Sequence, residues 1–301
     1  MTPRLASEAL AHAGFDVSPS DLQIEAREER WLVRLPGQRL AWFAASPNGV
    51  RRLRTERRVL GLLKAHCTFG VPHVLCESGT GGFDVRAGVP GESDPWRVYT
   101  RVRENAALAA ELGTAVGRML SEQHSRIQAA DVAGWLPRRP AWPESRQWVR
   151  DRLARVVEDA RLSAEVEAVM AAYEEVPVRE ADRTLVHTDV GFHNLAIDTT
   201  SGAVHGIFDY DGVAWADRHH DFRYLLFDFD RYELLEAAIA AYEPVVGHRI
   251  QRDRVFLYNA ACAVTYLAYR ADTAPEERSC GRTLAEDLRW SKSAIAKVLN
   301  A

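Results

Sequence analysis

The first third of the chain alternates apolar and polar residues in short runs. Residues 22–26 alternate in this way, and two further runs, 30–35 and 39–44, flank the pair Pro36-Gly37. Alternation at a period of two predicts half-buried strands, and a break of this kind between two runs predicts an antiparallel hairpin. Two further short strands are predicted, at residues 73–77 and 83–86.

Helical periodicity dominates the rest of the chain. Leu108, Leu112, Val116 and Leu120 recur every four residues, which predicts a helix from about residue 105 onward. An amphipathic helix is also predicted at the start of the chain, with Thr2 as its N-cap and Leu5 and Leu10 facing inward. Further helices are predicted at residues 50–65, 143–172, 231–243, 252–270 and 283–299, and short strands at 184–186, 194–197 and 204–208.

These elements predict an α+β protein with two lobes. The breaker cluster Gly88-Val89-Pro90-Gly91 separates the strand-rich part from the helical part. We therefore expect a small sheet-plus-helix lobe over residues 1–90 and a larger, mainly helical lobe over residues 91–301.

Composition narrows the class of protein. The 301 residues are 47% hydrophobic and 27% charged, with a formal net charge of −4, as is ordinary for a soluble globular protein. This charge gives no reason to expect nucleic acid or an anionic membrane as a partner. No apolar run is long enough to predict a transmembrane helix, and the first residues do not resemble a signal peptide. We therefore expect a cytoplasmic protein.

The clearest chemical pattern lies between residues 185 and 211. His187, Asp189 and Asn194 are ordered H-x-D-x-x-x-x-N, and Asp209 follows after an apolar strand, a turn and a second apolar strand. Phosphoryl transfer needs an oriented acceptor hydroxyl and cations that neutralise the phosphate oxygens. Asp189 can orient the hydroxyl and accept its proton, while Asn194 and Asp209 offer the hard oxygen ligands that suit Mg²⁺. We expect His187 to hold the loop through hydrogen bonds.

This order of residues resembles the catalytic loop and metal-binding segment of the protein-kinase-like superfamily. It looks most like the branch of the aminoglycoside phosphotransferases and choline kinases, whose D-P-x-x-D-L stretch is similar to residues 217–222, with Arg218 in place of proline. The resemblance implies a two-lobed protein-kinase-like fold, ATP or GTP as phosphate donor, Mg²⁺, and a small-molecule hydroxyl acceptor. It also implies that backbone groups of the interlobe hinge, at Ala87 and Val89, contact the base.

Four polar residues after this motif allow different interpretations. We expect Asp217 and Asp221 to bond the catalytic loop or to cap a helix. His219 and His220 could instead join the nearby aspartates in the metal site of a phosphohydrolase, which is the alternative enzymatic hypothesis. We favour a simpler interpretation, in which both histidines are exposed loop residues.

Glu56 falls on the apolar face of the 50–65 helix, so it should have a cationic partner. In the resembled family, a glutamate at this point pairs with a strand lysine that also holds the α- and β-phosphates. The present chain has no lysine before Lys64, and Trp42 lies near the expected position. The sequence around Trp42 is also similar to phosphotransferases that inactivate antibiotics of the viomycin and capreomycin type.

The missing lysine leaves three interpretations. Arg34 and Arg39 flank the Pro36-Gly37 turn, and a guanidinium is long enough to reach the phosphates from a neighbouring strand. We therefore predict that one of them replaces the lysine, oriented by Glu56, although the unknown strand register does not choose between them. In the alternative, both arginines face solvent and Mg²⁺ alone balances the charge of the phosphates. The non-enzymatic alternative is a catalytically weak, kinase-like binding protein.

The only indication of the chemical nature of the acceptor is the charge of the residues that follow the motif. An acidic cleft would favour a polycationic acceptor such as an aminoglycoside or a basic peptide antibiotic, although solvated helix faces would explain the same acids. Tyr258, Tyr266 and Tyr269 could line the acceptor pocket or form a core stripe of a helix. Residues 209–236 contain eight acids, Asp209, Asp211, Asp217, Asp221, Asp228, Asp230, Glu233 and Glu236, and three arginines.

Overall fold

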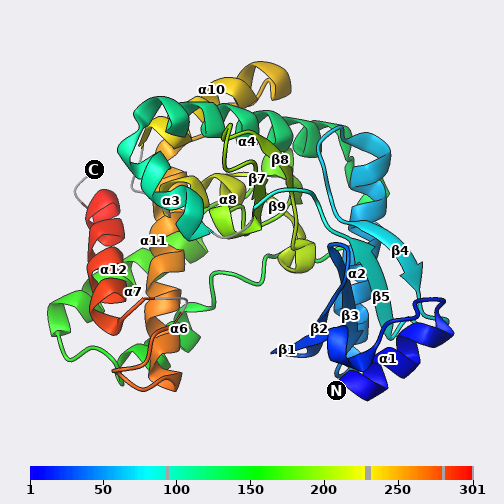
Figure 1. The fold of residues 1–301 in the computed structure, drawn as a ribbon. Coiled ribbons are helices and arrows are strands. Elements are labelled where there is room, and N and C mark those ends of the chain that lie inside the picture. Colours follow the sequence, from blue (N-terminus) through cyan, green and yellow to red (C-terminus); the bar gives the residue numbers. More distant parts are fainter. Residues whose placement is uncertain (93–94, 228–231, 280–281, 300–301) are drawn as a thin grey trace.

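The computed structural model describes residues 1–92, 95–227, 232–279 and 282–299. A small sheet with two helices forms one side of the molecule, and a larger helical lobe forms the other (Figure 1). This arrangement confirms the two-lobed α+β fold. Asp228 and Asp230, two of the acids counted above, lie outside the described residues.

The small lobe is built on an antiparallel sheet in the order β1-β2-β3-β5-β4. One face of the sheet packs on helix α1 through Leu10, Val33, Phe43 and Val85. The opposite face turns toward helix α2 and carries Asp84 and other polar residues. The elements are α1 (Pro3–His12), β1 (Gln23–Arg27), β2 (Arg30–Leu35), β3 (Arg39–Ala44), α2 (Pro47–His66), β4 (His73–Glu77) and β5 (Phe83–Ala87).

Most of these elements match the sequence predictions. The hairpin of β2 and β3 forms, and the Thr2 side chain accepts a hydrogen bond from Leu5 N as the N-cap of α1. The inward orientation predicted for Leu5 is wrong, because its side chain is 56% exposed. Ala6 and Leu10, four residues apart on one face of the helix, make the buried contacts instead.

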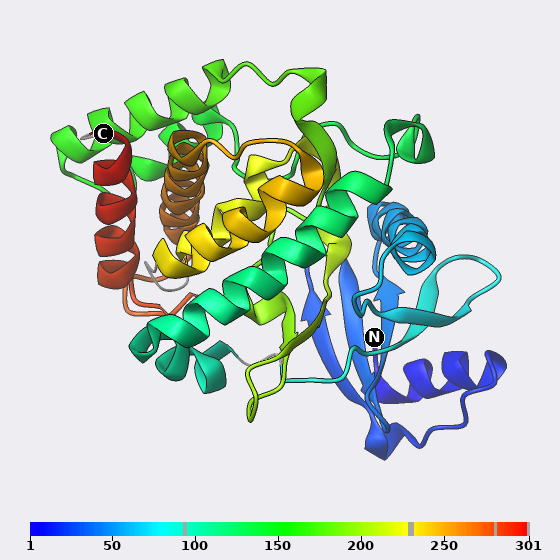
Figure 2. The same cartoon turned by 90° about the horizontal axis from the view of Figure 1, so that it is seen from above.

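The larger lobe is organised around two long helices that run side by side, α4 and α10 (Figure 2). Gly113 and Gly117 of α4 allow this close approach, because a Cβ at either position would lie 2.2 Å from a backbone oxygen of α10. The helices are α3 (Pro95–Glu104), α4 (Ala106–Arg126), α5 (Ala129–Val132), α6 (Arg146–Leu153), α7 (Ala160–Glu175), α8 (His219–Phe222), α9 (Tyr224–Phe227), α10 (Tyr232–Val246), α11 (Arg252–Tyr269) and α12 (Leu284–Leu299).

Two small antiparallel pairs lie within this lobe. Strand β6 (Arg183–Val186) pairs with β9 (Ala214–Asp217), and β7 (Leu195–Ile197) pairs with β8 (Val204–Ile207). The predicted helix over 143–172 is wrong in its middle, where the chain leaves the helix after Leu153 and Asp159 caps the start of α7. Helix α3 and strand β9 were not predicted.

The β7–β8 hairpin is bonded on one side to Gly70 of the small lobe and on the other side to Glu92, in the segment that follows β5. Gly70 N donates to His205 O at 2.9 Å, and Ile207 N donates to Gly70 O at 3.0 Å. On the other strand, Glu92 and Ile197 exchange backbone hydrogen bonds of 2.8 and 2.9 Å. The hairpin that carries the predicted metal ligands therefore has a fixed position relative to the sheet. The boundary at residue 90 stays a prediction.

No helix of the described residues is both long and apolar enough to cross a membrane.

Candidate active site

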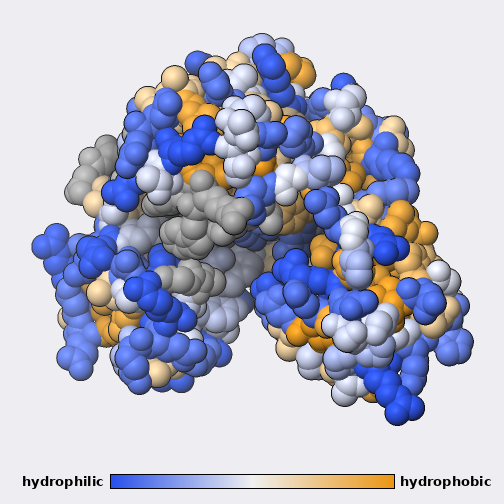
Figure 3. All heavy atoms as spheres, in the orientation of Figure 1, coloured by the Kyte–Doolittle hydropathy of each residue, from blue (hydrophilic) through white to orange (hydrophobic). Residues whose placement is uncertain are grey.

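A cleft of about 680 Å³ lies between the lobes and is lined from both sides. In the space-filling view the molecule is hollowed between the small lobe and the helices opposite it, with hydrophilic residues at the rim (Figure 3). Strands β2, β3 and β5 supply one wall, and the ends of β7 and β8 supply the other. The cleft brings together most of the residues singled out from the sequence: Arg34, Glu56, Ala87, Val89, Asn194 and Asp209.

The β7–β8 hairpin places Asn194 and Asp209 at the same end of the cleft. Phe208 N donates to Asn194 O at 3.0 Å, so the two predicted ligands leave the hairpin side by side. Asp209 adopts a left-handed backbone conformation, with φ of 64°. This conformation is uncommon for a residue other than glycine and is more frequent at functional sites.

Asp189 lies on the loop after β6 and contacts Asn194 directly. The Asn194 amide nitrogen donates to Asp189 Oδ2 at 3.0 Å and to Asp189 O at 2.8 Å, and His193 Nε2 lies 3.2 Å from Oδ2. Asp189 Oδ1 is buried and has no hydrogen-bond partner among the described residues. Because an unpaired buried carboxylate oxygen is costly, this atom is suited to accept a hydrogen bond from a bound hydroxyl.

The Asp189 carboxyl group is held in its ionised form. Burial disfavours the charge, but the hydrogen bond and positive charge of His193 outweigh that effect and keep the pKa of Asp189 well below its usual value. A group that is ionised at neutral pH can accept a proton or orient a hydroxyl.

Asp209 has the opposite electrostatic environment. Desolvation within the cleft, together with the negative charges of Glu56 and Asp211, raises its pKa to about 6. A bound cation would stabilise the ionised form of Asp209 in this environment. The Asn194 amide turns its nitrogen to Asp189, so its oxygen faces away from Asp189. The oxygen donors of Asn194 and Asp209 therefore fit a hard divalent cation such as Mg²⁺.

Buried hydrogen bonds support the catalytic loop from behind. His187 is fully buried, with Nε2 2.9 Å from Phe208 O, and its Nδ1 accepts from Asp189 N at 3.2 Å. Asp221 accepts from the backbone nitrogens of His187 and Thr188 at 3.0 and 2.7 Å. The structural roles expected for His187 and Asp221 are confirmed.

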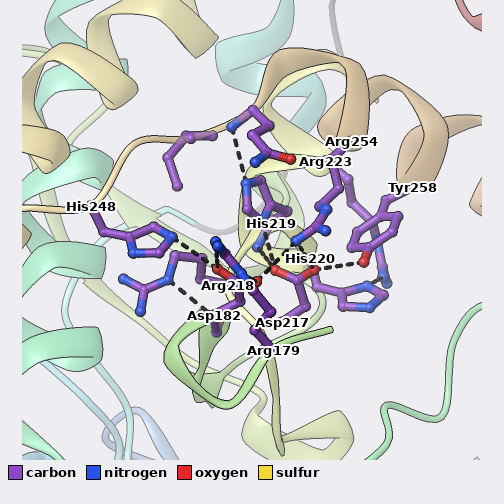
Figure 4. Close-up of polar contacts among 12 residues, drawn as sticks. Arg179, Asp182, Asp217, Arg218, His219, His220, Arg223, His248, Arg254 and Tyr258 are labelled. Atoms are coloured by element: carbon purple, nitrogen blue, oxygen red, sulfur yellow. Dashed lines mark hydrogen bonds and ion pairs between the residues drawn. The ribbon is translucent and has the colours of Figure 1, made fainter. Parts of the chain in front are cut away.

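Asp217 belongs to a second buried network, drawn in Figure 4. Its Oδ1 lies 2.5 Å from His219 Nδ1, and its Oδ2 accepts from Tyr258 OH at 2.6 Å and from Arg254 Nη1 at 3.0 Å. His219 N also donates to Asp217 Oδ1 at 3.1 Å. The expected structural role of Asp217 is therefore confirmed.

The interpretation of His219 and His220 as exposed loop residues is wrong. They lie on α8 and are 0% and 3% exposed, because α8 is buried under α11. His220 stacks on Tyr258 at 4.3 Å between ring centroids. Within the described part of the chain, no group of three or more histidines, cysteines or acids is arranged to hold a metal ion.

Glu56 is buried and paired with two arginines, as an inward carboxylate should be. Arg86 Nη1 lies 2.6 Å from Glu56 Oε1, and Arg30 Nη1 donates to Oε2 at 3.2 Å. Burial opposes the charge of Glu56, but these arginines outweigh it and lower the pKa. The expected pairing of Glu56 with Arg34 or Arg39 is wrong: Arg39 Nε donates to Pro36 O at the hairpin turn, and Arg34 is exposed further along β2.

Four arginines that line the cleft were not predicted as site residues: Arg27, Arg30, Arg52 and Arg86. Arg30 precedes Leu32 and Arg34 at a spacing of two, so the sequence did place it on the same face of β2. In the sheet, Arg30 pairs with Ala44 of β3, and this register brings the start of β2 next to α2. The register is a property of the folded sheet, so the sequence alone did not give it.

The acids counted from the sequence do not form an acidic wall. Asp211 pairs with Arg30 and Arg52, Asp217 and Asp221 are buried in networks, and Glu236 pairs with Arg252. The acids whose contacts are described therefore have structural roles or line the cleft. The number of acids in this segment gives no support for a cationic acceptor.

Aromatic side chains extend from Asp189 toward α11. The His193 ring lies 5.9 Å from Tyr224, whose hydroxyl lies 3.1 Å from that of Tyr266. Tyr266 stacks on Trp142 at 4.7 Å, and Tyr269 lies 4.9 Å from Trp142. Tyr258 is buried against Asp217, and Tyr224 is also buried, whereas Tyr266, Tyr269 and Trp142 are half-buried.

Residues 13–254 match the phosphotransferase enzyme family. The chain belongs to this family. It is therefore a phosphotransferase, and the resemblance of residues 185–225 to the aminoglycoside phosphotransferase branch is confirmed. No curated protein sequence matches the chain.

Solved structures share the fold over almost the whole length of this phosphotransferase. The GDP and kanamycin complex of APH(2")-IIia has 17% identity and a TM-score of 0.67, over 98% of this chain and 97% of that one. The macrolide 2'-phosphotransferase MphH from Brachybacterium faecium has 17% identity and a TM-score of 0.64, over 99% and 98%. The spectinomycin phosphotransferase APH(9)-Ia, solved with ADP and spectinomycin, has 11% identity and a TM-score of 0.64, over 98% and 97%.

Proposed function

We propose that this phosphotransferase transfers the γ-phosphate of ATP or GTP to a hydroxyl group of a small molecule. The observation that carries the proposal is that Asn194 and Asp209 lie together at one end of the interlobe cleft and that Asn194 is hydrogen-bonded to Asp189. The cleft has the volume of a site for a nucleotide-sized ligand. Ala87 and Val89 line its hinge side, where their backbone groups are proposed to contact the base.

Asp189 is the proposed base and orienting group. Its unpaired Oδ1 accepts the hydrogen bond of the acceptor hydroxyl, and the proton passes to the carboxylate as the hydroxyl oxygen attacks the γ-phosphorus. The new bond joins that oxygen to phosphorus, and the bond between the γ-phosphorus and the β–γ bridging oxygen breaks. Asn194 and Asp209 are the proposed ligands of Mg²⁺, which when bound neutralises charge on the phosphate oxygens.

We propose a ring-bearing acceptor with hydroxyl groups, of the kind found among aminoglycoside and basic peptide antibiotics. The support is the half-buried pair Tyr266 and Trp142, which the buried Tyr224 connects to His193 beside the proposed base. Aromatic faces stack on sugar and peptide rings, and they also attract cationic groups.

The test is a panel of hydroxylated antibiotics and metabolites, incubated with ATP or GTP and Mg²⁺ and analysed by mass spectrometry. The proposal expects at least one compound to gain one phosphate only when nucleotide and enzyme are both present, and none with Asp189→Asn. Phosphate release that needs no nucleotide would favour a hydrolase. Tight binding of a compound with no transfer would favour a kinase-like binding protein.

A further inference from the structure

Strand β3 carries an aromatic residue where a phosphate-binding lysine was expected. Trp42 lies opposite Leu32 of β2 and lines the cleft. The Arg30 guanidinium stacks over the Trp42 ring, with its central carbon 4.4 Å from the ring centroid. The cation nearest to position 42 is therefore Arg30 of the neighbouring strand β2, and the face of the Trp42 ring orients its guanidinium group.

The partners of the two buried arginines differ in a way that matters for ligand binding. Arg86 is fully engaged: its Nη1 pairs with Glu56, and its Nε and Nη2 donate to Asp84 at 2.6 and 3.1 Å. Arg30 donates to Glu56 from only one of its nitrogens, Nη1. Its Nη2 pairs with Asp211 at 2.8 Å, and its buried Nε has no hydrogen-bond partner among the described residues.

Asp211 does not depend on Arg30 for its charge. Arg52 donates to both of its carboxylate oxygens, from Nε to Oδ1 at 3.0 Å and from Nη2 to Oδ2. If an anion displaced Asp211 from Arg30, Asp211 would keep a bidentate partner and Arg30 would keep Glu56. The free-energy cost of this exchange is small, because neither Arg30 nor Asp211 is left as an unpaired buried charge.

We propose that Arg30 holds the nucleotide phosphates in place of the missing lysine, and that Asp211 occupies the position of the phosphate until the nucleotide binds. The inference rests on the proposed use of a nucleotide. Arg30 lines the same cleft as Asn194 and Asp209, and it presents Nη2 and the unpaired Nε to a phosphate oxygen pair. A planar guanidinium suits this bidentate contact better than an ammonium does.

The first test measures binding by calorimetry, with ATP, GTP and the corresponding nucleosides as probes. For the nucleotide that binds wild type better, Arg30→Ala should weaken triphosphate binding at least tenfold, about 1.4 kcal/mol, and should leave nucleoside binding unchanged. Arg30→Lys should lose less. The matched control is Arg54→Ala, which removes a charge from the exposed face of α2, away from the cleft.

The second test removes the carboxylate that competes for Arg30. In EDTA, where no magnesium contributes, Asp211→Asn should bind triphosphate more tightly than wild type, and this gain should disappear when Arg30→Lys is added. Weaker binding of Mg²⁺-free triphosphate to Asp211→Asn would overturn the placeholder role. This test remains available if Arg30→Ala fails to fold.

The outcomes separate this inference from the proposed function. If wild type binds triphosphate and a folded Arg30→Ala binds it equally well, the inference is wrong and the proposed function stands. If wild type binds no nucleotide at all, the proposed function is wrong, and the role of Arg30 falls with it.

Discussion

Asp189 is the residue whose environment is most specific to a chemical role. One carboxylate oxygen is fixed by Asn194 and His193, and the other is buried without a hydrogen-bond partner among the described residues. A purely structural aspartate would use both oxygens, as Asp221 does at the backbone of the catalytic loop. The two aspartates therefore differ in their hydrogen bonds, and they also differ in burial, since the Asp189 side chain is 37% exposed and that of Asp221 is fully buried.

Asp189→Asn should reduce kcat by roughly 10²–10⁴, the usual range for a positioned acid or base. Nucleotide affinity should stay unchanged, because the unpaired oxygen is proposed to face the acceptor. Single-turnover kinetics with a phosphorylated acceptor measure the first quantity, and calorimetry measures the second. Asp151→Asn, at an exposed position of α6, is the control. A variant that keeps more than half of the wild-type rate would remove Asp189 from the mechanism.

The oxygen donors of Asn194 and Asp209 predict dependence on magnesium and no stoichiometric zinc. Asp209→Asn should weaken the apparent affinity for Mg²⁺ in the reaction at least about tenfold, the loss typical when a metal site is perturbed. Titration of the activity with Mg²⁺ measures this change, and elemental analysis of the purified protein tests for zinc. One zinc per active molecule would contradict the assignment of the site.

At the scale of elements, the local sequence pattern predicted which helices and strands exist better than it predicted where each one begins and ends. The β2–β3 hairpin and helices α2, α4, α11 and α12 follow from periodicity and turn residues that lie within each segment. The break between α6 and α7 and the short strand β9 were not predicted. Strand β9 is a four-residue buried run whose pairing with β6 depends on residues about 30 positions away. Such a strand has no local signature beyond hydrophobicity.

The β7–β8 hairpin depends on a close backbone approach at one glycine. A Cβ at Gly206 would lie 2.0 Å from Gly70 O, in the bridge that connects the hairpin to the small lobe. Gly206→Ala should therefore lower the free energy of unfolding by roughly 1–3 kcal/mol, as overpacking does, and should reduce activity as the proposed metal ligands shift. Chemical denaturation and steady-state kinetics check both effects.

Gly61→Ala is the matched control for that substitution. Gly61 lies within α2, and a Cβ there would meet nothing within 4 Å. Alanine at this position should be neutral or should stabilise the helix by roughly 0.5–1 kcal/mol, with unchanged activity. Equal stability of Gly206→Ala and wild type would show that the bridge is not tightly packed.

At the scale of the whole molecule, the site combines residues that sequence could and could not assign. Asp189, Asn194 and Asp209 stand in one short segment, and their spacing together with the flanking apolar strands predicted their convergence. The charged groups around Glu56 come instead from four parts of the chain: β2, β5, α2 and the segment after β8. These parts meet only in the folded protein. Sequence predicted that Glu56 needs a cation, but the register of the sheet decides which arginine supplies it.

Asp182 connects distant parts of the larger lobe and gives a prediction about pH. Arg179 donates to both of its oxygens at 3.0 Å, and His248 Nε2 lies 3.1 Å away, as Figure 4 shows. The hydrogen bonds of Arg179 outweigh the effect of burial and lower the pKa of Asp182 from 3.8 to about 2. A carboxyl group with a lowered folded pKa stabilises the fold above its unfolded pKa and loses that contribution as pH falls through the folded pKa.

Asp182→Asn should therefore be less stable than wild type at pH 7, and this difference should shrink as the pH falls from about 4 toward 2. Urea denaturation of both proteins at several pH values measures the difference directly. Glu180→Gln, an exposed neighbour in the same turn, should show no such convergence. A difference that is constant over this pH range would mean that the Asp182 contacts stabilise the lobe through packing and neutral hydrogen bonds, and that the ionised carboxylate is not required.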